Sequence, residues 1–267
     1  MRKNMLIPLA MMALSTPAMA QDYGGTAQFE ILPGWRTPSG DHIAAAKITL
    51  APGWITYWRV PGEVGIPPQF YFSSDSAIAG ITPQLPVPEV FDKSGIISIG
   101  YEDSVIFPLT IDTDGVSGDI PLSGAVNVGV CEEICIPVTF SFETVLPQNG
   151  KRDANIVAAL ESVPLTRRQA NVGDVTCIID PTDDGLRVTA RIDAPPTGNS
   201  EYVVIEPSDP TIWVSQADVV RTGATLSATV EMAHPTGGPF AFDRSYVRIT
   251  ILNNDGRAID LRGCSAG

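Results

Sequence analysis

Histidine and positively charged residues are scarce in this sequence of 267 residues. It contains 2 His and 17 Lys+Arg against 30 Asp+Glu, which gives a formal net charge of −13 at pH 7. Nucleic-acid backbones and anionic lipid surfaces attract proteins with an excess of positive charge, so this balance argues against both. We therefore expect proteins or small molecules as partners, and no nucleic acid.

Long hydrophobic runs are missing after the first 20 residues, so no later segment provides the roughly 20 apolar residues of a membrane-spanning helix. The first 20 residues resemble a signal peptide, with Arg2 and Lys3, an apolar stretch at 6–14 and a small-x-small pattern that ends at Ala20. We predict cleavage after Ala20 and an exported, periplasmic protein that is not membrane-embedded. No cysteine follows the cleavage site, so we expect no lipid anchor.

Alternation of apolar and polar residues is what the sequence has in abundance. Hydrophobic residues make up 44% of the chain, and 24 Gly and 23 Pro separate short segments from one another. Side chains alternate between the two faces of a strand, so a period of two predicts strands that bury one face. Examples are TFSFETVL, LRVTARI, TLSATVEM and YVRITIL. We predict an all-β protein built from β-sandwiches.

One segment breaks this alternation and predicts a helix between Asp153 and Val163. Its apolar residues fall on one helical face, and Asp153 can cap the amino-terminal end. A short helix between β-rich regions is typical of a linker. We therefore expect a signal peptide at 1–20, a first β domain at 21–147, a linker at 148–170 and a second β domain at 171–267.

Two of the 4 cysteines, Cys131 and Cys135, are four positions apart in VGVCEEICIPVTF. On one straight strand their Cα atoms would be about 13 Å apart, whereas a disulfide needs about 4.4–6.8 Å. Glu132 and Glu133 are poor strand residues, so we expect a turn or a single helical turn between the cysteines. Either would bring the two residues close enough to form a disulfide.

The role of this pair stays open at this point among a redox pair, a structural disulfide and a metal site. A bridge across so short a loop stabilises a protein little. The acidic neighbours Glu132 and Glu133 disfavour the thiolate form, and no Lys, Arg or His lies between Val128 and Glu143 to oppose them. We expect thiols that exchange only when a specific partner supplies the reactive thiolate.

The other two cysteines, Cys177 and Cys264, lie near the two ends of the predicted second domain. A disulfide between them would close a long loop, and the chain-entropy model predicts that it would stabilise the folded state by about 4 kcal/mol. We predict a structural disulfide without a redox role.

Copper binding is the alternative function, because Cys-x-x-x-Cys-x-Pro presents two soft thiolates to Cu(I). A third ligand is hard to find, since His42 and His234 are far away in sequence and the mature chain has no Met-rich tract. The acidic turn at 180–185 lacks the spaced ligands of a calcium loop and predicts a hairpin turn. We therefore expect no bound metal and no cofactor.

Three motifs of the first half are GWITYWRVPGEVGIPPQF, GYEDSVIFPL and VCEEICIPVTF. Together they resemble the amino-terminal periplasmic domain of DsbD-type thiol:disulfide interchange proteins, particularly the ScsB-like branch. In the second half, CIIDPTDDGLRVTARID, SDPTIWVS, FDRSYVRITIL and AIDLRGC resemble the second β domain of that branch. The resemblance covers nearly the whole mature chain and implies immunoglobulin-like β-sandwich domains.

The resemblance also implies an activity, that of a protein-disulfide reductase. Cys131 and Cys135 would be the redox pair, with Cys135 forming the mixed disulfide and Cys131 resolving it, while Cys177 and Cys264 match the family's terminal cysteines. Electrons would come from a membrane thiol-disulfide transporter and pass to a periplasmic thioredoxin-like protein. Cytochrome c biogenesis and copper tolerance are the processes associated with such proteins.

The sequence differs from the better-known members, which space the two cysteines more widely and carry a fused transmembrane domain and a thioredoxin-like domain. The electron donor is therefore expected to be a separate polypeptide. In relatives an aromatic loop shields the cysteine pair, and we expect Tyr57 and Arg59 near it here. The Gly- and Pro-rich segment from Pro61 to Pro68 predicts a long, stiff loop, and loops of this kind often carry function.

Overall fold

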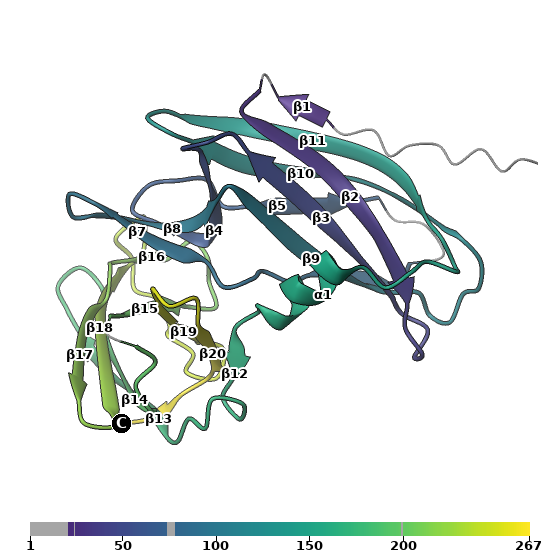
Figure 1. Ribbon diagram of the computed structural model, residues 1–267. Coiled ribbons are helices and arrows are strands. Elements are labelled where there is room, and N and C mark those ends of the chain that lie inside the picture. Colours follow the sequence, from purple (N-terminus) through teal and green to yellow (C-terminus); the bar gives the residue numbers. More distant parts are fainter. Residues whose placement is uncertain (1–20, 24, 74–77, 199) are drawn as a thin grey trace, which may run out of the picture.

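The computed structural model describes residues 21–23, 25–73, 78–198 and 200–267, so the predicted signal peptide lies outside the described residues. The described chain forms four β-sheets and one short helix, α1 (Figure 1). The sheets pack as two immunoglobulin-like β-sandwiches, which confirms the predicted fold class. No helix among these residues is long and apolar enough to cross a bilayer.

The first sandwich consists of two sheets. The strand order of one sheet is β1-β2-β3-β9-β6, and its strands are β1 (Gln21–Tyr23), β2 (Ala27–Arg36), β3 (His42–Leu50), β6 (Gly80–Pro83) and β9 (Ser104–Asp112). The order of the other is β11-β10-β4-β8-β7, with β5 paired to β10. Its strands are β4 (Ile55–Gly62), β5 (Gln69–Phe72), β7 (Glu89–Lys93), β8 (Ile96–Glu102), β10 (Ile120–Cys131) and β11 (Cys135–Leu146).

Aromatic and branched side chains from both sheets fill the core of the first sandwich. Trp58, Phe107 and Phe140 are among its largest buried residues, and the rings of Phe29 and Phe140 stack with their centroids 5.1 Å apart. Burial of a side chain of this size contributes about 1.5–3 kcal/mol. The core holds the strands that carry the first cysteine pair in a fixed register.

The helix α1 (Ala154–Glu161) begins where the sequence predicts it. The Asp153 carboxylate accepts hydrogen bonds from the backbone N–H groups of Asn155 at 2.7 Å and Ile156 at 3.4 Å, which satisfies two free donors of the first turn. Ile156 packs with Ile43 and other apolar residues on the outer face of the sheet that contains β2, β3 and β9. Figure 1 shows α1 beside this sheet, where the chain passes to the second sandwich.

The second sandwich also has two sheets. One has the order β12-β20-β19-β15, with strands β12 (Leu165–Thr166), β15 (Glu201–Glu206), β19 (Arg248–Asn253) and β20 (Ala258–Arg262). The other has the order β16-β18-β14-β13-β21, with β17 paired to β18; its strands are β13 (Val175–Pro181), β14 (Leu186–Asp193), β16 (Trp213–Val214), β17 (Asp218–Thr222), β18 (Thr225–Ala233) and β21 (Ser265–Ala266). The domain boundaries stay a prediction; β12 lies inside the predicted linker and pairs with β20.

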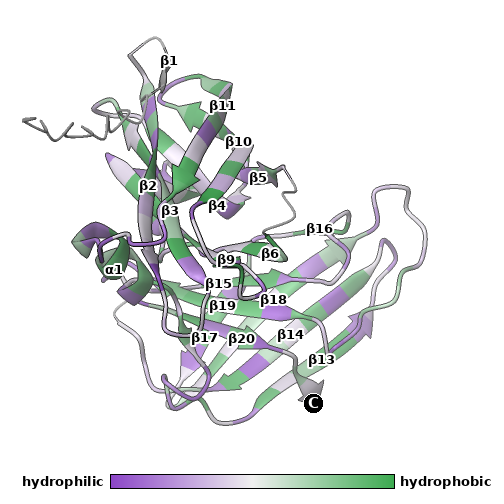
Figure 2. Cartoon of the chain, turned by 90° about the vertical axis from the view of Figure 1, so that its right-hand side faces the viewer, coloured by the Kyte–Doolittle hydropathy of each residue, from purple (hydrophilic) through white to green (hydrophobic). Residues whose placement is uncertain are grey.

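Alternating hydropathy accounts for the second sandwich as it does for the first. Figure 2 shows hydrophobic and hydrophilic residues in turn along β14 and β18. In β18 every second side chain is buried, and the register places Val188 opposite Val230 and Ala190 opposite Ala228. The acidic turn before β14 closes a hairpin with a hydrogen bond from the N–H of Thr182 to the carbonyl of Gly185. The prediction of a hairpin turn at this place is confirmed.

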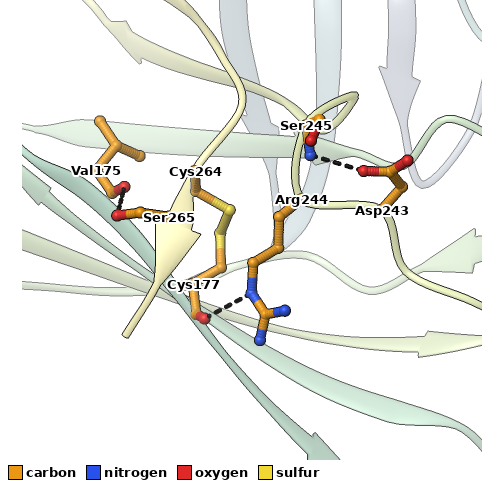
Figure 3. The surroundings of a disulfide bond; sticks show 7 residues. All are labelled: Val175, Cys177, Asp243, Arg244, Ser245, Cys264 and Ser265. Carbon is orange, nitrogen blue, oxygen red and sulfur yellow. Dashed lines mark hydrogen bonds between the residues drawn. A yellow bond between two sulfur atoms is a disulfide. The ribbon is translucent and has the colours of Figure 1, made fainter.

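A disulfide joins Cys177 of β13 to Cys264, which precedes β21 (Figure 3). The two Cα atoms are 5.7 Å apart and 87 positions separate the residues. Cys177 is fully buried in the second core, and the Arg244 side chain donates a hydrogen bond of 3.2 Å to its carbonyl. The bridge therefore fixes the last strand of the chain against the first strand of this sheet.

Polar and apolar contacts join the two sandwiches. The Arg59 guanidinium on β4 donates to the Glu206 carboxylate on β15 at 2.8 and 3.0 Å and to the Thr250 hydroxyl on β19 at 2.7 Å. It also lies 3.6 Å from the centre of the Trp58 ring. Tyr202 of the second sandwich packs against the core of the first. These contacts hold β15 and β19 beside the sheet that carries the first cysteine pair.

Stability should fall as the pH decreases from 7.5 to 5.5, because of His42. His42 is fully buried; its Nε2 donates to the carbonyl of Pro33 at 2.6 Å, and Nδ1 has no partner among the described residues. Burial lowers the pKa of His42 below its ordinary value of 6.5. Below about pH 6.5 the unfolded chain therefore binds a proton that the folded chain does not bind, which favours unfolding.

Thermal unfolding of His42→Gln and His234→Gln at both pH values tests this expectation. His234 is a suitable control because it lies in an exposed turn and bonds Thr236. The control should keep the full pH dependence and His42→Gln should lose part of it; equal dependence in the two variants would refute the assignment.

Candidate redox disulfide

The first cysteine pair closes the hairpin between β10 and β11. The antiparallel register of these strands ends with Cys131 directly opposite Cys135, and residues 132–134 form the turn. The two residues form a disulfide with Cα atoms 4.1 Å apart. The expected turn is therefore present, whereas the single helical turn that the spacing also allowed is not. Cross-strand neighbours are close enough to pair, which a straight strand would not permit.

The two sulfur-bearing residues differ in exposure. Cys131 is only 3% exposed, because it is paired with Ile55 of β4 as well as with β11. Cys135 begins the outer strand β11 and is exposed. An external thiolate that approaches the disulfide therefore meets Cys135 first.

Tyr57 of β4 contacts this accessible cysteine. Its hydroxyl oxygen is 3.4 Å from Sγ of Cys135, and because a disulfide sulfur carries no hydrogen, Tyr57 is the donor. The Tyr57 side chain is 2% exposed, and burial raises its pKa, so the hydroxyl stays protonated. The neighbouring Thr56 fixes the strand, since its hydroxyl donates to the carbonyl of Gly129 at 2.9 Å.

The loop at 63–68 lies over Tyr57 and over the end of β10. Gly65 has a φ of +129°, and a Cβ at this position would come within 2.4 Å of the Tyr57 ring. A Cβ on Gly129 would lie 2.8 Å from Cβ of Ile66, whose carbonyl accepts a hydrogen bond from the N–H of Gly129. Both glycines are therefore required for the close approach of this loop.

Exposed apolar side chains lie on the two segments next to the disulfide, the turn between β10 and β11 and the loop at 63–68. Ile134 at the tip of the turn is 75% exposed, and Val64, Ile66 and Ile136 are also exposed large hydrophobic residues. We call these four residues the redox face. Exposed apolar residues that gather around one reactive bond are typical of a protein-docking surface.

Glu132 and Glu133 lie in the turn, as expected, and both are exposed. Neither carboxylate forms an ion pair with another described residue. The Glu132 side chain lies close to Gly53, since a Cβ placed on Gly53 would be 3.5 Å from the Glu132 carboxylate. The turn therefore presents negative charge beside the disulfide, which disfavours a thiolate when the bond is reduced.

The sequence-based candidates are thus only partly brought together. Tyr57 contacts Cys135, but Arg59 points to Glu206 and Thr250 of the second sandwich. Residues two positions apart on a regular strand point to the same face, so Arg59 would be expected beside Tyr57. The pairing of β4 with β8 is irregular after Tyr57, and the Arg59 side chain therefore points elsewhere. The contacts of Gly65 and Gly129 were not predicted; the only signal was the presence of glycine in a Pro-rich loop and inside a strand.

The described residues contain no group of three or more His, Cys, Asp or Glu side chains that could hold a metal ion. Once the disulfide is reduced, the site offers the two thiolates of Cys131 and Cys135 as soft ligands. The arrangement supports thiol-disulfide chemistry, because Cys135 is an exposed residue, Cys131 is covered by β4, and the Tyr57 hydroxyl contacts the sulfur of Cys135.

Comparisons with known proteins agree with this geometry. Residues 22–147 match the family model described as "Thiol:disulfide interchange protein DsbD, N-terminal". The crystal structure of the N-terminal periplasmic domain of ScsB from Proteus mirabilis has the same fold, with a TM-score of 0.69 and 23% sequence identity over 91% of this chain and 94% of that chain. No curated protein sequence matches the chain.

The fold and the hairpin disulfide define the first sandwich as a thiol:disulfide interchange domain. The match of residues 22–147 to the DsbD amino-terminal family confirms the resemblance found in the sequence.

Replacement of Tyr57 by Phe should raise the pKa of the Cys135 thiol in the reduced protein. The hydroxyl that now contacts Cys135 would donate to its thiolate, and loss of a hydrogen bond to a charged group is worth about 1.5 kcal/mol, or about one pKa unit. The pH dependence of alkylation by iodoacetamide measures this pKa. Tyr71→Phe is the matched control, because the Tyr71 hydroxyl bonds Gln69; an unchanged alkylation profile in Tyr57→Phe would refute the role of Tyr57.

Proposed function

We propose that this protein relays electrons in the periplasm through the disulfide of Cys131 and Cys135. The observation that carries the proposal is the unequal exposure of the two cysteines, with Cys135 accessible and Cys131 covered by β4. The domain arrangement proposed with it is a redox domain at 21–147, a linker at 148–170 and a second β domain at 171–267. Family membership supports this reading, because the matched family is one of thiol:disulfide interchange proteins.

Reduction begins when a donor thiolate attacks Sγ of Cys135. The new bond joins the donor to Cys135, and the bond to Cys131 breaks with Cys131 leaving as the thiolate. A second thiolate of the donor then attacks the mixed disulfide, so the donor is oxidised and both cysteines take up protons as thiols. Two electrons have passed from the donor to the pair. Tyr57 stabilises Cys135 whenever it carries negative charge.

Transfer to the acceptor follows the same path in reverse. The Cys135 thiolate attacks the acceptor disulfide and releases one acceptor thiolate. The Cys131 thiolate then attacks Cys135 of the mixed disulfide, which restores the bond between the two cysteines and releases the reduced acceptor. Because β10 and β11 hold the two residues opposite each other, this second step is intramolecular and fast.

The proposed donor is a membrane thiol-disulfide transporter and the proposed acceptor is a periplasmic thioredoxin-like protein. Both assignments are based on the matched family and on the similarity of this chain to a periplasmic domain. A contribution to cytochrome c biogenesis or to copper tolerance would depend on which acceptor is used.

Mixing the reduced protein with an oxidised thioredoxin-like domain tests the proposal. Alkylation and mass spectrometry should show that thiols disappear at Cys131 and Cys135 while they appear in the thioredoxin-like domain. The same reduced protein should release Cu(I) to a competing chelator. Absence of thiol transfer, together with Cu(I) retention that is lost in Cys135→Ser, would favour the copper-binding alternative.

A further inference from the structure

A cleft of about 440 Å³ lies between the two sandwiches. The first sandwich contributes residues at the end of β4 and on β8, and the second contributes β15 and the segment around β16. Most of the lining side chains are apolar, among them Val60, Ile97, Ile99 and Val204. Binding sites in proteins are typically mostly apolar concavities of this size, often at domain interfaces.

Trp213 of β16 stands out among the lining residues. It is 58% exposed, although β16 pairs with β18 at the edge of its sheet. An exposed Trp at the margin of an apolar cleft is the side chain that most often dominates the binding energy of a protein interface.

The loop that follows β4 connects the cleft to the residues beside the disulfide. Gly62 and Glu63 line the cleft, and Gly65 lies on the ring of Tyr57, which contacts Cys135. Glu63 and Gly65 are two residues apart, so their Cα atoms are at most about 7.6 Å from each other. A folded domain of 100 residues has a radius of gyration of about 13 Å and can therefore cover the redox face and the cleft together.

The charge in the cleft favours a cation. Two carboxylates line it, and Arg221 neutralises that of Glu201 with hydrogen bonds that include one of 2.7 Å. Glu63 is exposed, and among the described residues its carboxylate accepts only a long hydrogen bond of 3.4 Å from the N–H of Ile97. One negative charge is therefore available to a ligand beside an apolar surface.

We propose that the redox partner binds in two places at once. Its cysteine reaches Cys135, and a neighbouring apolar segment with a basic residue occupies the cleft between Trp213 and Glu63. The inference rests on the proposed function and assigns a role in partner binding to the second sandwich. Occupancy of the cleft raises the local concentration of the partner cysteine at the disulfide.

Three synthetic peptides test this arrangement. Each begins with one cysteine followed by a flexible spacer of six Gly and Ser residues, which spans up to about 20 Å. The basic peptide ends in Leu-Lys-Phe-Lys-Leu and the acidic peptide ends in Leu-Glu-Phe-Glu-Leu. The third peptide ends with the spacer and has no further segment. The rate at which each peptide opens the disulfide of Cys131 and Cys135 is measured by acid quenching and mass spectrometry, with glutathione as a small thiol for reference.

The basic peptide should open the disulfide about tenfold faster than the peptide that ends with the spacer. Trp213→Ala should reduce this ratio to about one, and Glu63→Gln should narrow the difference between the basic and the acidic peptide, while Glu132 and Glu133 keep part of it. Tyr246→Ala is the matched control, since Tyr246 is an exposed aromatic residue of the second sandwich that does not line the cleft, and it should keep the tenfold ratio.

A ratio near one in the unaltered protein, or an unchanged ratio in Trp213→Ala, would overturn the inference while leaving the proposed function intact. Failure of glutathione and of all three peptides to open the disulfide would instead overturn the proposed function, and the inference with it.

Discussion

The Cys131→Ser variant should hold its redox partner as a stable mixed disulfide. In the unaltered protein Cys131 lies opposite Cys135 and resolves the mixed disulfide within the same molecule. Ser cannot do this, so the covalent complex should persist at least about a hundredfold longer, because an intramolecular step of high effective molarity has been removed. Non-reducing electrophoresis followed by mass spectrometry of the complex measures its lifetime and identifies the partner.

Cys135→Ser is the matched control for this experiment. The remaining Cys131 is covered by β4, so this variant should form little or no mixed disulfide. If Cys135→Ser traps the partner and Cys131→Ser does not, the assignment of the attacking and resolving cysteines is reversed.

Loss of the second disulfide should damage folding and leave exchange intact. In a Cys177→Ser/Cys264→Ser variant the chain is no longer closed across 87 positions, and the buried sulfur at Cys177 is replaced by a hydroxyl. Removal of a native bridge of this kind costs about 2–5 kcal/mol. The thermal transition of the second sandwich should therefore move to lower temperature, as followed by calorimetry.

The rate at which glutathione opens the disulfide of Cys131 and Cys135 should be unchanged in the same variant. A variant that keeps its melting temperature but loses this exchange would contradict the division of roles between the two pairs.

Local patterns account for much of the fold. The alternation in TLSATVEM gives β18 with every second residue buried, and Asp153 before a helical period gives α1. Both features depend on residues close together in the sequence, and this is why they could be predicted. The cross-strand pairing of β10 and β11 also follows from a local feature, the Glu-Glu turn between the cysteines.

Contacts between distant residues account for what could not be predicted. Arg59 was expected at the cysteines, but its partner Glu206 lies 147 positions further along and no local pattern marks it. The cleft near Trp213 exists only because two independently patterned sandwiches pack together. The position of Gly65 over the Tyr57 ring likewise depends on the path of a loop, which composition alone does not determine.

Redox titration with differential alkylation tests the central claim most directly. The protein is equilibrated in buffers of graded potential, free thiols are alkylated, and mass spectrometry reports each pair separately. A relay predicts that Cys131 and Cys135 become reduced in the range of exchange proteins, about −120 to −270 mV, while Cys177 and Cys264 stay oxidised until below about −300 mV. If both pairs instead resist reduction together to below about −300 mV, the first pair is an ordinary structural disulfide and the relay is ruled out.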